Sequence, residues 1–190
     1  MNPAMQYLIT HTYFHHNYKV STPDKQHLFH VVNSSFRPRK PDLTFHQGPD
    51  SHGPIAGICK FRHFSSDCEA GLGSPDQPSK VDWVHLHKHD KMRQWWFRMK
   101  MDESKKKKTF TWKRVHLRNT WKHELVEEST QNVVAILSPS EVFKKTDQMD
   151  IFSDFGPHFN LSVLISGLAV LEKVRRLEAS DSGAPGGGGC

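Results

Sequence analysis

The segment FNLSVLISGLAVL, residues Phe159 to Leu171, is apolar on every side of a helix drawn through it. Its only interruptions are small or neutral: Asn160, Ser162, Ser166 and Gly167. A helix without a polar face has to be surrounded by other protein. The segment rises only about 20 Å, and a bilayer crossing takes about 20 apolar residues. The pattern therefore predicts a buried core helix and no membrane span.

The limits of this helix follow from its flanks. Pro157 suits a first helical position, and we expect the helix to run from Phe159 to Leu177. The charged residues after the apolar segment predict the point at which the chain returns to water: Glu172, Lys173, Arg175 and Arg176.

The residues before the helix predict roughly eleven short strands. Between Arg93 and Met101, one face carries Trp95, Phe97 and Met99, and the other carries polar residues. An antiparallel sheet of this size has to close, because its edges and its apolar face need cover. We therefore predict an all-β fold, a closed antiparallel β-barrel of about twelve strands around a central hydrophobic C-terminal α-helix.

Length and composition favour one domain. We expect residues 1–178 to form a single barrel, with the membership of residues 1–40 left open, and the Gly-rich residues 179–190 to form a disordered tail. The N-terminus has no signal-peptide pattern, and three scattered cysteines predict no disulfide framework, so we expect a cytoplasmic protein. Cys59 lies in an apolar strand, and Cys68 lies in a polar stretch where we expect it to be exposed. A prenylation box needs three residues after its cysteine, so we do not expect one at Cys190.

Three stretches resemble a known superfamily. DFGPHFNLSVLISGLAVLEKVRR (Asp154 to Arg176) is similar to the central-helix segment of the tubby C-terminal, LURP-one-related and phospholipid scramblase superfamily. HFSSDCEAGLGSPDQPSKVDW (His63 to Trp83) and FTWKR (Phe110 to Arg114) resemble uncharacterised fungal proteins of the same fold. The resemblance covers residues 40–177. It implies a non-enzymatic protein, because tubby domains bind phosphoinositide headgroups through basic residues on the outer surface of the barrel and scramblase-like members associate with membranes.

Charge gathers in one part of the chain, whose formal net charge is +6. Residues 80–123 carry fourteen Lys and Arg against four Asp and Glu, which points to an anionic partner. Trp96 could lie at a membrane interface. We predict an outer basic hairpin that docks on anionic phospholipid or phosphoinositide through Arg98, Lys100, Lys105, Lys106, Lys107, Lys108, Lys113 and Arg114, although Arg114 shares the face of Phe110 and Trp112. The alternative is a solvated turn on a structural or protein-interaction barrel without a lipid ligand.

The sequence gives less support to a metal site, to an enzyme or to nucleic-acid binding. His85, His87 and His89 would share one face of a strand as three zinc ligands might, but a closed site also needs a fourth ligand or a water, for which Asp90 is only a candidate, so we expect no metal site. The sequence has no Walker loop, dinucleotide fingerprint or G-x-S-x-G elbow, so we expect no cofactor and no enzyme. Nucleic acid is not an expected partner, because stacking needs exposed aromatic rings and Phe97 and Trp112 fit inward positions.

Overall fold

Twelve strands precede a single α-helix in the computed structural model of the chain. It describes residues 2–12, 17–34, 40–62, 65–89, 94–101, 106–117, 120–140 and 146–182. The elements are β1 (Met5–His11), β2 (Tyr18–Ser21), β3 (His27–Asn33), β4 (Leu43–Gln47), β5 (Ile55–Phe61), β6 (Cys68–Leu72), the 3₁₀ turn η1 (Pro78–Lys80), β7 (Asp82–Lys88), β8 (Gln94–Lys100), β9 (Lys107–Leu117), β10 (Thr120–Glu127), β11 (Val133–Ser138), β12 (Thr146–Ile151) and α1 (Pro157–Ser182).

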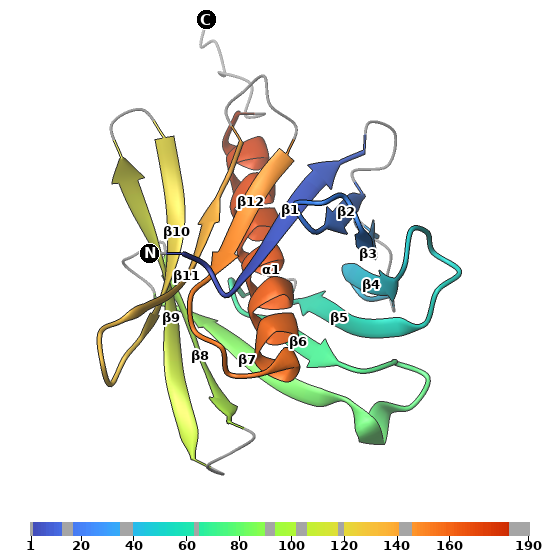
Figure 1. Cartoon of the computed structure of the whole chain (residues 1–190), viewed down its shortest axis with the longest axis horizontal. Helices are drawn as coiled ribbons and strands as arrows, with labels where there is room; N and C mark the ends of the chain where they lie inside the picture. The colour runs from blue at the N-terminus through green and yellow to red at the C-terminus, as the bar shows by residue number, and fades with distance from the viewer. Residues whose placement is uncertain are drawn as a thin grey trace, which may run out of the picture.

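The strands form one closed antiparallel barrel (Figure 1). Each strand pairs with its neighbours in the sequence, and β1 also pairs with β12, from Met5 opposite Ile151 to Thr10 opposite Thr146. Closure removes both sheet edges. The predicted fold class is confirmed, and the first 40 residues supply β1, β2 and β3 to the barrel wall.

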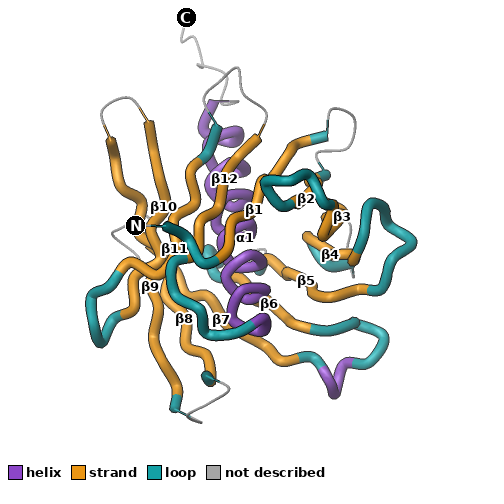
Figure 2. The backbone as a smooth tube through the Cα atoms, in the orientation of Figure 1, coloured by secondary structure: helices purple, strands orange, loops and turns teal. Residues whose placement is uncertain are grey.

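Helix α1 runs along the middle of the barrel, as the backbone trace shows (Figure 2). Residues 162–170 are all buried. Contacts come from opposite walls: a Cβ at Gly57 of β5 would lie 2.3 Å from Ile165, and a Cβ at Gly167 would lie 2.5 Å from Met149 of β12. Glycine at these two positions lets wall and helix approach closely. Among the described residues, no helix is long and apolar enough to cross a bilayer.

The inner face of the wall follows the predicted alternation. Trp95, Phe97 and Met99 of β8 are buried, and Arg98 between them is exposed. The ring of Phe110 on β9 lies 5.6 Å from that of Phe97 and 5.4 Å from that of Phe159, centroid to centroid. Aromatic rings therefore fill the space between the barrel wall and the N-terminal end of the helix.

Three expectations about individual residues were wrong. Glu172 does not mark a return to water; it is fully buried, because polar groups of β2 and β3 cover it. Cys68 is not exposed, since it shares the inner face of β6 with Ala70 and Leu72. The helix continues to Ser182, beyond the predicted end at Leu177. Most of the expected tail, residues 183–190, lies outside the described residues.

Candidate functional site

Three basic side chains meet on the outer surface of β8 and β9. In the antiparallel register, Arg98 is opposite Thr109 and Lys100 is opposite Lys107. Residues two apart on a strand share a face, and directly opposite residues lie about 5 Å apart. Arg98, Lys100 and Lys107 are all exposed, so their charges form one cluster at the end of the hairpin.

A cleft opens beside this cluster, between β7 and β8. The two strands pair only at His87 opposite Trp96 and Lys88 opposite Trp95, and beyond these pairs they run apart (Figure 1). Elsewhere along the two strands, β7 pairs with β6 and β8 pairs with β9, but β7 and β8 do not pair with each other. The cleft has a volume of about 360 Å³, and its lining includes Trp83, His85, His87, Trp96, Arg98, Lys100 and Lys107. We call these seven residues the cleft face.

Among the described residues, acids lie near the cleft face but form no ion pair with its three cations. Arg98 donates from Nε to Thr109 Oγ1 at 3.3 Å, and its guanidinium lies 5.6 Å from the centre of the Trp96 ring. Within the described ranges, no carboxylate forms an ion pair with Arg98, Lys100 or Lys107. Asp82, an acid that also lines the cleft, lies 3.3 Å from His158 of α1. The cleft therefore presents three cations beside aromatic rings.

Lys108, the next residue along β9, is held in a different way. Its Nζ lies 3.1 Å from Glu127 Oε1 and 4.4 Å from the centre of the Phe155 ring. Burial tends to raise the pKa of Glu127, but hydrogen bonds from Ser129, Lys108 and Thr130 outweigh burial and lower that pKa. Glu127 is therefore ionised at neutral pH and balances the charge of Lys108.

The other predicted site residues do not join the cleft face. Lys106 is exposed next to Lys107, and Lys113 lies farther along β9, opposite Gln94 and Glu124. Lys105 falls outside the described residues.

Arg114 is not on the outer surface at all. β9 alternates, so Arg114 follows Phe110 and Trp112 on the inner face. Its guanidinium lies 3.9 Å from the centre of the Trp121 ring and 3.2 Å from the Glu178 carboxylate. Its assignment to the lipid-binding hairpin is therefore corrected.

The β7 histidines serve as walls of the cleft. His87 lies 4.7 Å from Trp96, ring to ring, and 3.4 Å from Asp67, whereas His85 lies 3.5 Å from Glu69. They face different carboxylates, and the described ranges contain no group of three metal-ligating side chains arranged around one point. Sequence reasoning missed their role in the cleft, although the alternation of Trp83, His85 and His87 with apolar residues places them together on the outside.

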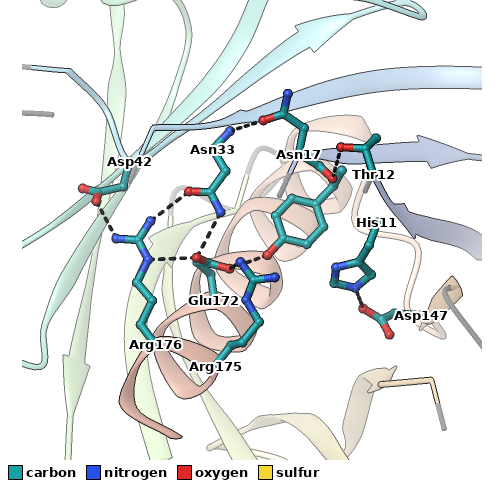
Figure 3. A network of polar contacts seen from close by, with 10 residues as sticks. His11, Thr12, Asn17, Asn33, Asp42, Asp147, Glu172, Arg175 and Arg176 are labelled. Carbon is teal, nitrogen blue, oxygen red and sulfur yellow. Dashed lines mark hydrogen bonds and ion pairs between the residues drawn. The ribbon is translucent and has the colours of Figure 1, made fainter. Parts of the chain in front are cut away.

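A second charged cluster lies inside the barrel, around Glu172 of α1 (Figure 3). Its carboxylate accepts hydrogen bonds from the Tyr18 hydroxyl at 2.5 Å and Asn33 Nδ2 at 3.0 Å, and it pairs with Arg175 and Arg176, both at 2.8 Å. Burial tends to raise the pKa of Glu172, but these partners outweigh burial and lower that pKa. The same environment raises the pKa of Tyr18, through burial first and the Glu172 charge second.

This inner cluster ties the helix to the wall. Arg176 also donates to Asp42 and to the Asn33 side-chain oxygen, both at 2.9 Å. One network therefore connects α1 with β2, β3 and the residue that precedes β4 (Figure 3). Both carboxylate oxygens of Glu172 already have partners in the chain. We therefore assign the network to structure and not to ligand binding.

Comparison with known proteins gives one structural similarity. No family model matches this sequence, and no curated protein matches it. The chain is similar to an X-ray structure of a protein from Arabidopsis thaliana, with 9% sequence identity and a TM-score of 0.48 over 88% of this chain and 93% of that one.

Proposed function

We propose that this chain is a non-catalytic binding domain of the tubby, LURP-one-related and phospholipid scramblase superfamily, and that its cleft face docks on anionic phospholipid. The observation that carries the proposal is the set of three cations, Arg98, Lys100 and Lys107, without carboxylate partners among the described residues. Uncompensated cations side by side repel one another, and an anionic ligand relieves that repulsion.

The surroundings of these cations suit a phosphorylated headgroup. A volume of about 360 Å³ lies within the range of small-ligand sites. Arg binds phosphate oxygens through a planar fork of donors, and Lys does so as a point charge. Trp96 and Trp83 are half-buried and line the cleft, where indole rings favour the boundary between headgroups and acyl chains.

Electrostatics also supports a peripheral association with the cytoplasmic leaflet. Each Lys or Arg near an anionic surface contributes about 1 kcal/mol, and the contribution falls within a Debye length. Three such residues together give an attraction of about 3 kcal/mol, which salt weakens. We therefore expect reversible docking of the folded barrel, with a phosphoinositide headgroup as the preferred ligand.

Cosedimentation with liposomes tests the proposal. Neutral phosphatidylcholine vesicles and vesicles that also contain phosphoinositide are compared at low and high salt, with the wild type and the Lys100→Glu/Lys107→Glu double variant. We expect binding to the anionic vesicles only, weakened by salt, and reduced by more than about tenfold in the variant.

Lys19→Glu, compared with the single cleft variant Lys107→Glu, is the control with an equal change of charge. Lys19 is exposed on β2, which lies six strands away from β8 around the barrel. It changes the net charge of the protein without changing the cleft face, so its binding should stay close to that of the wild type. Equal losses in the Lys19 and cleft variants would mean that net charge alone drives binding. No binding by the wild type would leave a protein-interaction barrel.

A further inference from the structure

Arg114 and His123 face each other on the inner side of the barrel wall. They are directly opposite in the register of β9 and β10. The Arg114 side chain is 10% exposed and His123 is 2% exposed. Four of their nitrogen atoms have no hydrogen-bond partner in the described part of the chain: Arg114 Nε and Nη1, and His123 Nδ1 and Nε2. Glu178 approaches Arg114 Nη1 to 3.2 Å without the geometry of a hydrogen bond.

Such a pair is unusual in a folded protein. More than about 90% of buried polar groups are hydrogen-bonded, because a buried group without a partner has lost its bonds to water and gained none in exchange. Arginine offers only donors, and a neutral imidazole offers one donor and one acceptor. Burial first, and the Arg114 charge second, lower the pKa of His123 to about 4, so the imidazole is neutral at pH 7. The complementary group is therefore rich in oxygen acceptors and negatively charged.

The cover over this pair consists of surface side chains. Trp121 lies over the guanidinium and is 45% exposed, and the Glu178 side chain is 51% exposed. Both side chains are exposed, and exposed side chains change rotamer on the picosecond-to-nanosecond timescale. The remaining neighbour of His123 across β10 and β11 is the apolar Leu137, which offers no competing polar group. An oxyanion would reach Arg114 from this side, past Trp121 and Glu178.

We propose that Arg114 and His123 form a binding site for a small oxyanion, a phosphate or carboxylate group, under Trp121. In this site Glu178 is an internal substitute that an external oxyanion displaces from Arg114. The site is separate from the cleft face, because Arg114 is seven residues from Lys107 along β9, about 23 Å, and lies on the opposite face of the strand.

Titration of the full chain with inorganic phosphate, and separately with acetate, tests the site. Calorimetry gives the affinity, and the imidazole signals of His123 in NMR spectra report where the anion binds; ionic strength is held constant with sodium chloride. We expect saturable binding of at least one anion with a shift of the His123 signals. The anion that binds identifies the group as phosphate or carboxylate, and saturation by both means that the site recognises negative charge and oxygen acceptors alone.

Three variants make the test specific. Arg114→Gln should weaken binding by about tenfold or more, because the hydrogen bonds to a charged group are lost. Glu178→Gln should strengthen binding by about fivefold, because an exposed ion pair of about 1 kcal/mol no longer competes. Arg98→Gln, on the cleft face, reports separately whether phosphate also occupies the cleft.

The gain in Glu178→Gln is informative because this exposed substitution leaves the fold intact. Absence of saturable binding of either anion by both the wild type and Glu178→Gln would overturn the proposal. So would an affinity that depends on Arg98 and not on Arg114, since phosphate would then occupy the cleft face. Failure of liposome binding, in contrast, would leave this site untouched.

Discussion

The two charged clusters of this barrel hold similar side chains in opposite circumstances. Around Glu172, a buried carboxylate pairs with two partly buried arginines at 2.8 Å and accepts hydrogen bonds from a hydroxyl and an amide within 3.0 Å. On the cleft face, Arg98, Lys100 and Lys107 lie outside and contact no carboxylate of the described chain. The difference shows that the partners of a basic residue, and not its charge alone, separate structural from binding roles.

The largest expected effect comes from the inner cluster. Glu172→Gln removes the buried carboxylate that pairs with Arg175 and leaves Arg176 paired with Asp42. Loss of one partner from a buried ion pair costs about 3–5 kcal/mol, which is an upper bound here because the Arg175 side chain is 37% exposed. Urea unfolding should show this loss. Glu69→Gln is the control, because the Arg62–Glu69 pair is as short, at 2.7 Å, but lies at the surface, where water and salt screen it and only a small loss is expected. Equal losses in the two variants would remove the distinction between the clusters.

A second, smaller effect depends on pH and on His123. Its pKa is about 4 in the folded chain, through burial first and Arg114 second, against about 6.5 in an unfolded chain. The unfolded state therefore binds the proton more tightly between these values, and stability falls as the pH decreases from about 6.5 to about 4, by about 3 kcal/mol in all. Above about pH 6.5 this contribution is constant.

His123→Leu should flatten that part of the stability profile. Unfolding free energies of the wild type and the variant, measured by urea from pH 7 to pH 4, check the prediction, and His27→Gln serves as a control because His27 is exposed on β3. The contribution of Glu172 to the free energy of unfolding also decreases at lower pH, and it does so in both proteins. The difference between the two profiles therefore isolates His123. Parallel profiles would contradict the assignment.

The smallest expected effect compares neighbouring lysines of one hairpin. Lys107→Gln should weaken liposome binding by about 1 kcal/mol, whereas Lys108→Gln should change it little, because Glu127 already balances Lys108. Conversely, Glu127→Gln should strengthen binding, since it leaves the Lys108 charge uncompensated. Cosedimentation of the three variants gives the order. Equal effects of the two lysine variants would mean that the lysine run acts as a diffuse charge and not through its partners.

The barrel and its helix could be predicted because their signals are local. An apolar segment without a polar face has to be enclosed, and the alternation of large apolar and polar residues along β8 is enough to assign Trp95, Phe97 and Met99 to the inside. The same alternation along β9 puts Arg114 on the face of Phe110 and Trp112, so its inclusion among the outer basic residues went against the pattern.

The remaining features depend on contacts between distant residues. Glu172 is covered by Tyr18 and Asn33, which are 154 and 139 residues away in the sequence. The residues next to Glu172 in the sequence therefore do not predict its burial. The partner of Lys108 is Glu127, across the β9–β10 hairpin. The cleft arises where β7 and β8 stop pairing, and that depends on register, which a single sequence specifies weakly.

The position of α1 in the chain has a consequence for biosynthesis. Twelve strands are translated before the helix that fills their interior. A nascent chain that has emerged as far as β12 therefore has the wall of the barrel but nothing to wrap around, and its inner aromatic and aliphatic faces have no partner. Chain order makes the interval before Pro157 emerges from the ribosome the period of greatest exposure to aggregation and to chaperones.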